Sequence, residues 1–138
     1  MVRNMIAEES ATERMAVTVQ GQLVPLPQWL VEGVSERIIL KGVALVETFH
    51  GITNFHVVNK NIVARTKGRS GDNYLTKVSI WDKEKDERPV LLTCNCPHGV
   101  FSTGICYHKV ALILKVLMLP SMPSSRPLPK YEDDFDID

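Results

Sequence analysis

The stretch CNCPHGVFSTGICYH, residues 94–108, decides the fold of this chain. It holds all three cysteines of the 138 residues and two of the four histidines. These side chains form two pairs, each with one residue between its members, and residues 97–105 separate the pairs. Three thiolates and one imidazole make a tetrahedral ligand set that is typical of Zn²⁺. The stretch therefore predicts one zinc ion bound by Cys94, Cys96, Cys106 and His108.

The two pairs are expected to converge for different reasons. Residues two apart on a strand share one face, so Cys94 and Cys96 can point together at a strand end. Residues two apart in a helix lie about 200° apart, so Cys106 and His108 can converge only where a helix begins. The helix is therefore expected to begin at or just before Cys106. Four protein ligands leave no open position, which predicts a structural metal; His98 is an alternative to His108 as ligand.

Helical patterns flank this stretch on both sides. Ser35 can cap a helix over residues 36–50, with Gly51 ending it, although Gly42 weakens the prediction. Its apolar side is expected to consist of Ile39, Leu40, Val43 and Val46. A strongly apolar helix is expected over residues 105–119, with Lys109 and Lys115 marking its wet side.

Strand patterns lie between the two helices. Alternating or β-branched runs separated by turn signals predict strands over residues 52–58, 62–67, 74–82 and 88–94. Within the third run, one face is expected to carry Tyr74, Thr76, Val78 and Ile80. The predicted fold class is α+β: a small antiparallel meander with an N-terminal helix and a closing C-terminal helix, stabilised by one structural zinc.

Three segments are expected along the chain. Residues 1–20 lack clear periodicity and predict a loose N-terminal lead-in. Residues 21–119 are expected to form the zinc-binding domain, with a finger core at about 52–118. Residues 120–138 are rich in proline and serine and then acidic, which favours a disordered linker and tail.

The formal net charge of zero hides an uneven distribution. Residues 130–138 hold five acids and one lysine, so the remainder of the chain carries the opposite excess. Basic side chains gather between residues 60 and 77, which predicts nucleic-acid contacts through Arg65, Lys67, Arg69 and Lys77, with Tyr74 able to stack on a base. The alternative is a solvated hairpin tip with Tyr74 in the sheet core.

Several classes of protein are not favoured by the sequence. No apolar run approaches the ~18 residues of a membrane helix, and the acidic N-terminal stretch does not resemble a signal or transit peptide. An intracellular protein is expected, cytoplasmic or, in a eukaryote, nuclear. A zinc deaminase would need H-x-E and P-C-x-x-C, which are absent. A cysteine-dependent enzyme is an alternative, but no general base is evident, so neither an enzyme nor a small-molecule substrate is predicted.

The C-x-C and C-x-H pairs, on a strand end and a helix entrance, resemble the SWIM-type zinc finger. Supporting features are Pro97 and Gly99 after the first pair, Ala111 after His108, and the Tyr74–Ile80 strand of pattern Y-x-T-K-V-x-I. The resemblance covers residues 38–118.

The resemblance implies a ββα zinc-binding core that binds DNA or proteins. It implies an accessory or regulatory factor in DNA transactions such as recombination, transposition or chromatin processes, with a recombinase-like or helicase-like protein as partner. The alternative is a protein–protein adaptor with no direct nucleic-acid contact.

Overall fold

A computed structural model describes residues 15–68, 71–85, 87–97 and 104–120. The chain begins with a hairpin of β1 (Ala16–Val19) and β2 (Gln22–Pro25) and continues with α1 (Gln28–Gly33) and α2 (Glu36–Glu47). A four-stranded sheet follows, and α4 (Tyr107–Leu117) closes the fold. The sheet is made of β3 (Ile52–Val58), β4 (Asn61–Lys67), β5 (Asn73–Ser79) and β6 (Leu92–Cys94), and the 3₁₀ turn η2 (Lys83–Lys85) joins its last two strands.

The four-stranded sheet is antiparallel with the order β3-β4-β5-β6, and the hairpin forms a separate two-stranded sheet. The meander predicted from the sequence is thus confirmed, as is the mixed α+β class; the described residues contain three α-helices. The last strand is shorter than the expected 88–94, since β6 begins at Leu92 and Val90 is 99% exposed.

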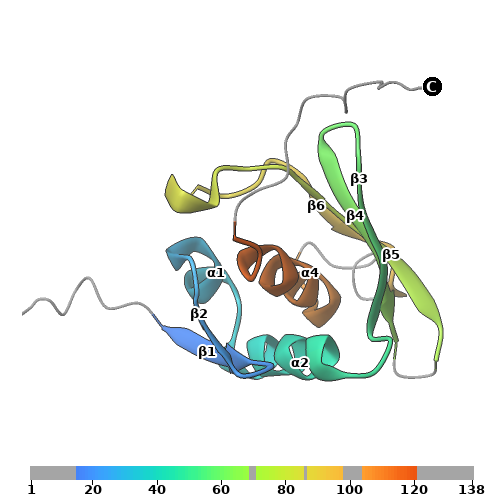
Figure 1. Cartoon of the computed structure of the whole chain (residues 1–138), viewed down its shortest axis with the longest axis horizontal. Helices are drawn as coiled ribbons and strands as arrows, with labels where there is room; N and C mark the ends of the chain where they lie inside the picture. Colours follow the sequence, from blue (N-terminus) through green and yellow to red (C-terminus); the bar gives the residue numbers. More distant parts are fainter. Residues whose placement is uncertain (1–14, 69–70, 86, 98–103, 121–138) are drawn as a thin grey trace, which may run out of the picture.

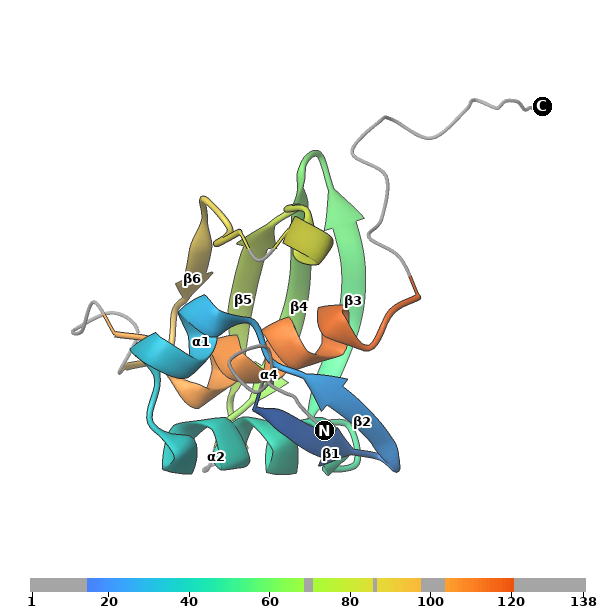
Figure 2. The ribbon, with the colours of Figure 1, turned by 90° about the vertical axis from the view of Figure 1, so that its left-hand side faces the viewer.

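Helix α4 lies at the centre of the molecule (Figures 1 and 2). One side packs on the sheet, and the other side packs on α2, with α1 nearby in the ribbon. This position explains why its side chains are buried almost all round, including Val110, Ala111, Leu112, Ile113, Leu114 and Val116. The expected wet side at Lys109 is therefore wrong: Lys109 is buried and its Nζ donates to the carbonyl of Gly104 at 3.3 Å.

Helix α2 begins as predicted. The Ser35 hydroxyl accepts from the Ile38 N–H at 3.3 Å and satisfies one of the free donors of the first turn. The helix ends at Glu47 because the backbone of Thr48 is extended, so it is shorter than the predicted helix, which reached residue 50. Leu40 was expected on the buried side but is 52% exposed, and Leu45 is buried instead.

The β1–β2 hairpin was not predicted. Gln20 and Gly21 form its turn, with φ values of 51° and 82°; the second is a conformation that glycine adopts without strain. Its inward side chains, Val19 and Val24, are buried in the main core. The loose lead-in predicted over residues 1–20 is therefore wrong for Ala16–Val19, and residues 1–14 and 121–138 lie outside the described part of the chain.

Within the described ranges, no helix is both long and apolar enough to cross a bilayer.

Candidate metal centre

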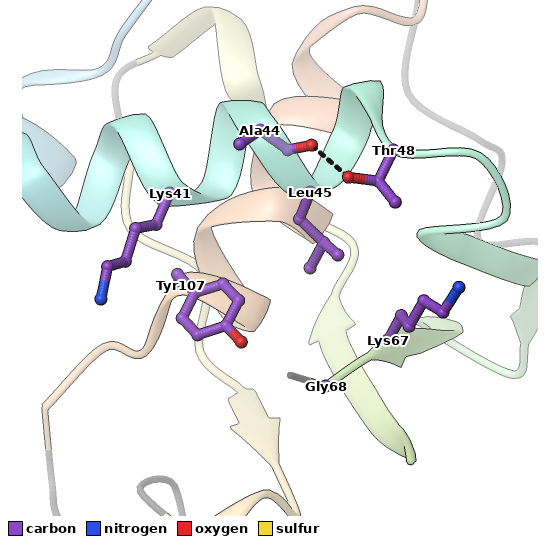
Figure 3. A pocket seen from close by; sticks show the side chains of 7 residues that line it. All are labelled: Lys41, Ala44, Leu45, Thr48, Lys67, Gly68 and Tyr107. Carbon is purple, nitrogen blue, oxygen red and sulfur yellow. Dashed lines mark hydrogen bonds between the residues drawn. The ribbon is translucent and has the colours of Figure 1, made fainter. Parts of the chain in front are cut away.

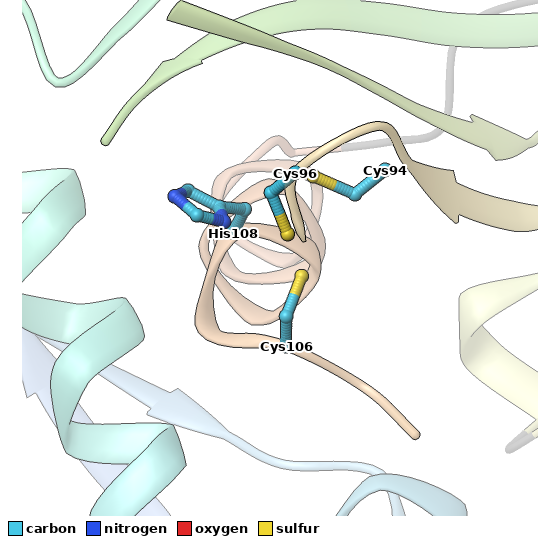
Figure 4. A group of neighbouring side chains, drawn as sticks. All are labelled: Cys94, Cys96, Cys106 and His108. Carbon is cyan, nitrogen blue, oxygen red and sulfur yellow. The ribbon is translucent and has the colours of Figure 1, made fainter. Parts of the chain in front are cut away.

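The four predicted ligands come together at one place in the fold. Their ligand atoms all lie within 4.8 Å of one another, and all four residues are buried. A tetrahedral site with Zn–S bonds of ~2.3 Å has ligand atoms about 3.8 Å apart, so an ion requires only small adjustments. The end of β6 supplies Cys94 and Cys96, and the entrance of α4 supplies Cys106 and His108 (Figure 4).

Asn95 explains how the first pair is held. Its side-chain oxygen accepts from the Leu75 N–H at 2.8 Å, and its own N–H donates to the Leu75 carbonyl at 3.2 Å. Both bonds tie Asn95 to β5, so the chain continues alongside that strand beyond the end of β6. The two cysteines that flank Asn95 therefore present their sulfurs on the opposite side, towards α4.

The second pair converges because Cys106 is the N-cap of α4. Its φ of −82° and ψ of 167° are extended, while Tyr107 is the first helical residue. The Cys106 carbonyl already accepts from the Val110 N–H at 3.1 Å. The helix thus begins just after Cys106, slightly later than the predicted start at or just before Cys106, and the extended backbone of Cys106 lets the two side chains converge.

His108 supports occupation by a metal. It is only 4% exposed, and in the described part of the chain neither of its ring nitrogens has a hydrogen-bond partner. Buried polar atoms nearly always have a partner, so a ring nitrogen without one needs an explanation. A metal ion bound to one nitrogen would supply it. The ring is held in place by Tyr74 and Tyr107, whose ring centroids lie 5.1 and 4.2 Å away.

The sulfur atoms are electrostatically coupled. The pKa of the Cys94 thiol is lowered, mainly by a hydrogen bond with the Cys106 thiol and further by the neighbouring His108 ring and the Thr76 hydroxyl, while burial opposes this effect. The pKa of Cys106 is raised by the same contact and by burial. One sulfur of the pair therefore holds a thiolate while the other keeps the shared proton. A cation among the sulfurs would replace that proton and allow all of them to ionise.

Thr76 and Asn95 are site residues that sequence reasoning missed. The Thr76 hydroxyl donates to Cys94 Sγ at 3.4 Å and lies 3.0 Å from the Thr66 hydroxyl. Thr76 belongs to the strand face that the alternation predicted, and the structure places this face on the inner side of the sheet. Nothing in the sequence connected that face with the cysteines, because the pairing of Thr76 with Cys94 is a tertiary feature.

The predicted nucleic-acid residues lie on the other face of the sheet. Val63 pairs with Lys77 across the β4–β5 ladder, and Arg65 and Lys67 follow Val63 at steps of two residues. Cross-strand partners and alternate residues share a face, so the three cations point to the same side. The inward positions of β4 are fully buried and comprise Ile62, Ala64 and Thr66. Arg69 and the alternative ligand His98 lie outside the described residues.

Tyr74 does not belong to that cationic face. It pairs with Thr66, an inward position, and packs against the cysteine cluster. Tyr74 therefore lies on the inner side of the sheet, half-buried, which favours the alternative interpretation over stacking on a base bound at the cationic face.

Comparisons of the chain with protein-family models, with curated proteins and with solved structures each found no match. The inference of function consequently starts from the site and from the surfaces of the fold.

Proposed function

We propose that this chain is a zinc-binding interaction module that binds DNA and acts as an accessory or regulatory factor in DNA transactions. One Zn²⁺ joins the end of β6 to the entrance of α4, and the outer face of the four-stranded sheet binds the phosphate backbone. The observation that carries the proposal is the gathering of Arg65, Lys67 and Lys77 on that face.

A structural role for the zinc follows from its ligands. Four protein ligands complete a tetrahedron and leave no position for water or substrate, so we propose no catalytic role. Three thiolates, a neutral imidazole and Zn²⁺ leave one negative charge. The α4 N-terminus offsets it, and the Lys109 N–H donates to the Cys106 sulfur.

The charge of the outer face supports a polyanionic partner. The strands β3, β4, β5 and β6 contain no aspartate or glutamate. Arg65 is exposed, and Lys67 and Lys77 are half-buried, with their stems against the sheet. Arg65 and Lys67 are two residues apart on one strand, which spaces their Cα atoms at about 6.7 Å. Such a row of cations suits the repeating charges of a nucleic-acid backbone better than a single carboxylate.

The experiment is a DNA titration of the full, zinc-loaded chain at about 50 and 200 mM salt. Each phosphate contact contributes roughly −0.9 to the slope of log K against log salt, so three contacts give a slope near −2.7. The double change Arg65→Glu and Lys77→Glu should weaken binding at low salt and flatten the slope. Lys85→Glu is the control, because Lys85 lies on η2 away from this face and each substitution makes the same change of charge. Unchanged binding by the double variant would refute the proposal.

A second candidate function is a protein adaptor without nucleic-acid contact. The observation that favours it is Phe49, which is 81% exposed in the loop after α2 and stacks on His50 with ring centroids 3.7 Å apart. Large exposed aromatic side chains are common at protein interfaces. The resemblance to SWIM-type fingers suggests a recombinase-like or helicase-like partner inside the cell. On this alternative Phe49→Ser would abolish partner capture, and no DNA binding would be measured at either salt concentration.

A further inference from the structure

A pocket opens between α2, the end of β4 and the entrance of α4, next to the metal centre. Its volume is about 440 Å³, within the range of sites that hold small ligands or single nucleotides. The lining residues are Lys41, Ala44, Leu45, Thr48, Lys67, Gly68 and Tyr107. None of these is acidic, and two are lysines, so the pocket favours an anionic ligand.

The arrangement of the lining residues separates charge from apolar surface. Lys41 and Lys67 lie on opposite sides of the pocket, and Leu45 and the Tyr107 ring lie between them (Figure 3). The Lys41 ammonium is 6.0 Å from the centroid of the Tyr107 ring. A ligand that fits this order has two anionic groups with an apolar, flat body between them.

Lys67 connects the pocket with the outer face of the sheet. It is the last residue of β4 and shares its face with Arg65, yet it also lines the pocket. A strand of nucleic acid that follows Lys77, Arg65 and Lys67 therefore arrives at the mouth of the pocket. Lys41 then offers a further cation on the far side, beyond the Tyr107 ring.

We propose that this pocket takes one unpaired nucleotide of single-stranded nucleic acid. The base packs against Tyr107 and Leu45, and the two flanking phosphates contact Lys41 and Lys67. The inference rests on the proposed nucleic-acid function and names its preferred substrate. A base can enter only when it is not stacked within a duplex, and stacking on an aromatic ring tolerates every base because each has a π-face. The module would therefore prefer single strands with little sequence preference.

Two variants of the full, zinc-loaded chain test the pocket without touching the outer face. Lys41→Glu reverses one of its charges. Ala44→Gln fills it from an exposed position of α2 and leaves the charge unchanged. The probes are a fluorescent oligothymidine of about 12 nucleotides and a duplex of the same length, followed by anisotropy. Each variant is expected to bind the single strand about tenfold more weakly and the duplex within about twofold of the parent chain. Lys85→Glu should change neither affinity.

A third probe separates the base from the phosphates. An abasic oligomer of the same length retains every phosphate, so it should lose its sensitivity to Ala44→Gln and keep its sensitivity to Lys41→Glu. Zinc content and thermal unfolding, measured on each variant, should match those of the parent chain, so that a loss of binding reports the pocket.

Four outcomes would overturn the inference. These are unchanged single-strand binding, an equal loss for single strand and duplex, an equal effect of Ala44→Gln on the abasic oligomer, and displacement of the oligomer by an acidic, aromatic-containing peptide at equal concentration. The double variant Arg65→Glu and Lys77→Glu shows whether only the pocket inference has failed or the proposed DNA-binding function as well. It should lose duplex and single-strand binding together, whatever the pocket variants do.

Discussion

Gly42 of α2 lies directly against Val110 of α4. A Cβ on Gly42 would stand 2.5 Å from Val110 Cγ1 and 3.2 Å from the backbone nitrogen of Ala111. The missing side chain therefore sets how closely the two helices approach. The first turn of α4 carries His108 and follows directly on Cys106, so the same contact helps to position two of the metal ligands.

Gly42→Ala should destabilise the protein, although alanine is the better helix former. The change gains about 1 kcal/mol of helix propensity, but overpacking between two buried helices costs typically 1–3 kcal/mol. We expect the free energy of unfolding to fall by up to about 2 kcal/mol, measured by urea denaturation of the zinc-loaded chain.

Gly33→Ala is the matched control for this prediction. Gly33 ends α1, and a Cβ placed there would meet nothing within 4 Å. The same substitution should therefore leave stability unchanged or raise it slightly, because alanine restricts the unfolded chain. If both glycine variants behaved alike, close helix packing would not be the reason for Gly42.

The four ligands could be predicted from the sequence because the spacing that identifies them is local to each pair. Each pair lies within three residues, and the spacing of Cys106 and His108 predicted that α4 begins close to Cys106, although its first helical residue is Tyr107. The alternation in β5 likewise predicted which residues share a face with Thr76. These features depend on the side-chain periodicity of a single helix or strand and not on the elements packed against it.

The failures concern contacts between elements. Gly42 weakened the prediction of a helix, but it is the position at which α4 approaches α2. Lys109 was expected in water because charged residues usually are, yet α4 is covered on both sides and the lysine reaches the Gly104 carbonyl. Leu40 fell on the apolar side by periodicity, but the structure leaves it exposed and buries Leu45 instead. Periodicity gives the direction of the apolar stripe on a helix, but it does not give the width of the surface that packs against that stripe.

Loss of one metal ligand should release the metal and destabilise the fold. We expect about one zinc per chain by elemental analysis of the native protein, and much less for Cys106→Ser or His108→Ala. Structural zinc contributes on the order of 10 kcal/mol of apparent binding free energy in small domains, so both variants should melt at a much lower temperature. Equal stability of the metal-free and metal-loaded chains would contradict a structural role.

Thr76→Val should weaken zinc binding without unfolding the sheet. Valine keeps the shape of threonine but removes the hydroxyl that donates to Cys94 Sγ. Mutation of a residue that hydrogen-bonds to a metal ligand typically lowers metal affinity by about 10- to 100-fold. We therefore expect zinc affinity to fall roughly tenfold, measured by competition with a chelator. Thr66→Val is the comparison, because the Thr66 hydroxyl is bonded to Thr76 and to the Tyr74 carbonyl and does not contact a sulfur. A similar loss in both variants would show that packing, and not the bond to sulfur, is responsible.

The metal-free protein should be most stable near the pKa of an unfolded thiol, about 8.5. Folding lowers the pKa of Cys94, so below this pH the unfolded chain binds one more proton and stability rises with pH. Folding raises the pKa of Cys106, so above this pH the folded chain keeps a proton that the unfolded chain loses, and stability falls. Each limb has a slope of at most about 1.4 kcal/mol per pH unit.

Urea unfolding of the reduced, chelator-treated chain between about pH 6 and 10 measures this dependence, with sulfate present to strengthen apolar burial. The Cys106→Ser chain should lose the alkaline limb, because serine does not ionise in this range. It should also lose part of the acid limb, since Cys106 is the main cause of the lowered pKa of Cys94. Zinc should abolish the alkaline limb in the parent chain, because a metal-bound thiol is already deprotonated. A metal-free chain whose stability does not fall above pH 9 would mean that the two sulfurs do not share a proton, and that the cluster is held apart until the metal binds.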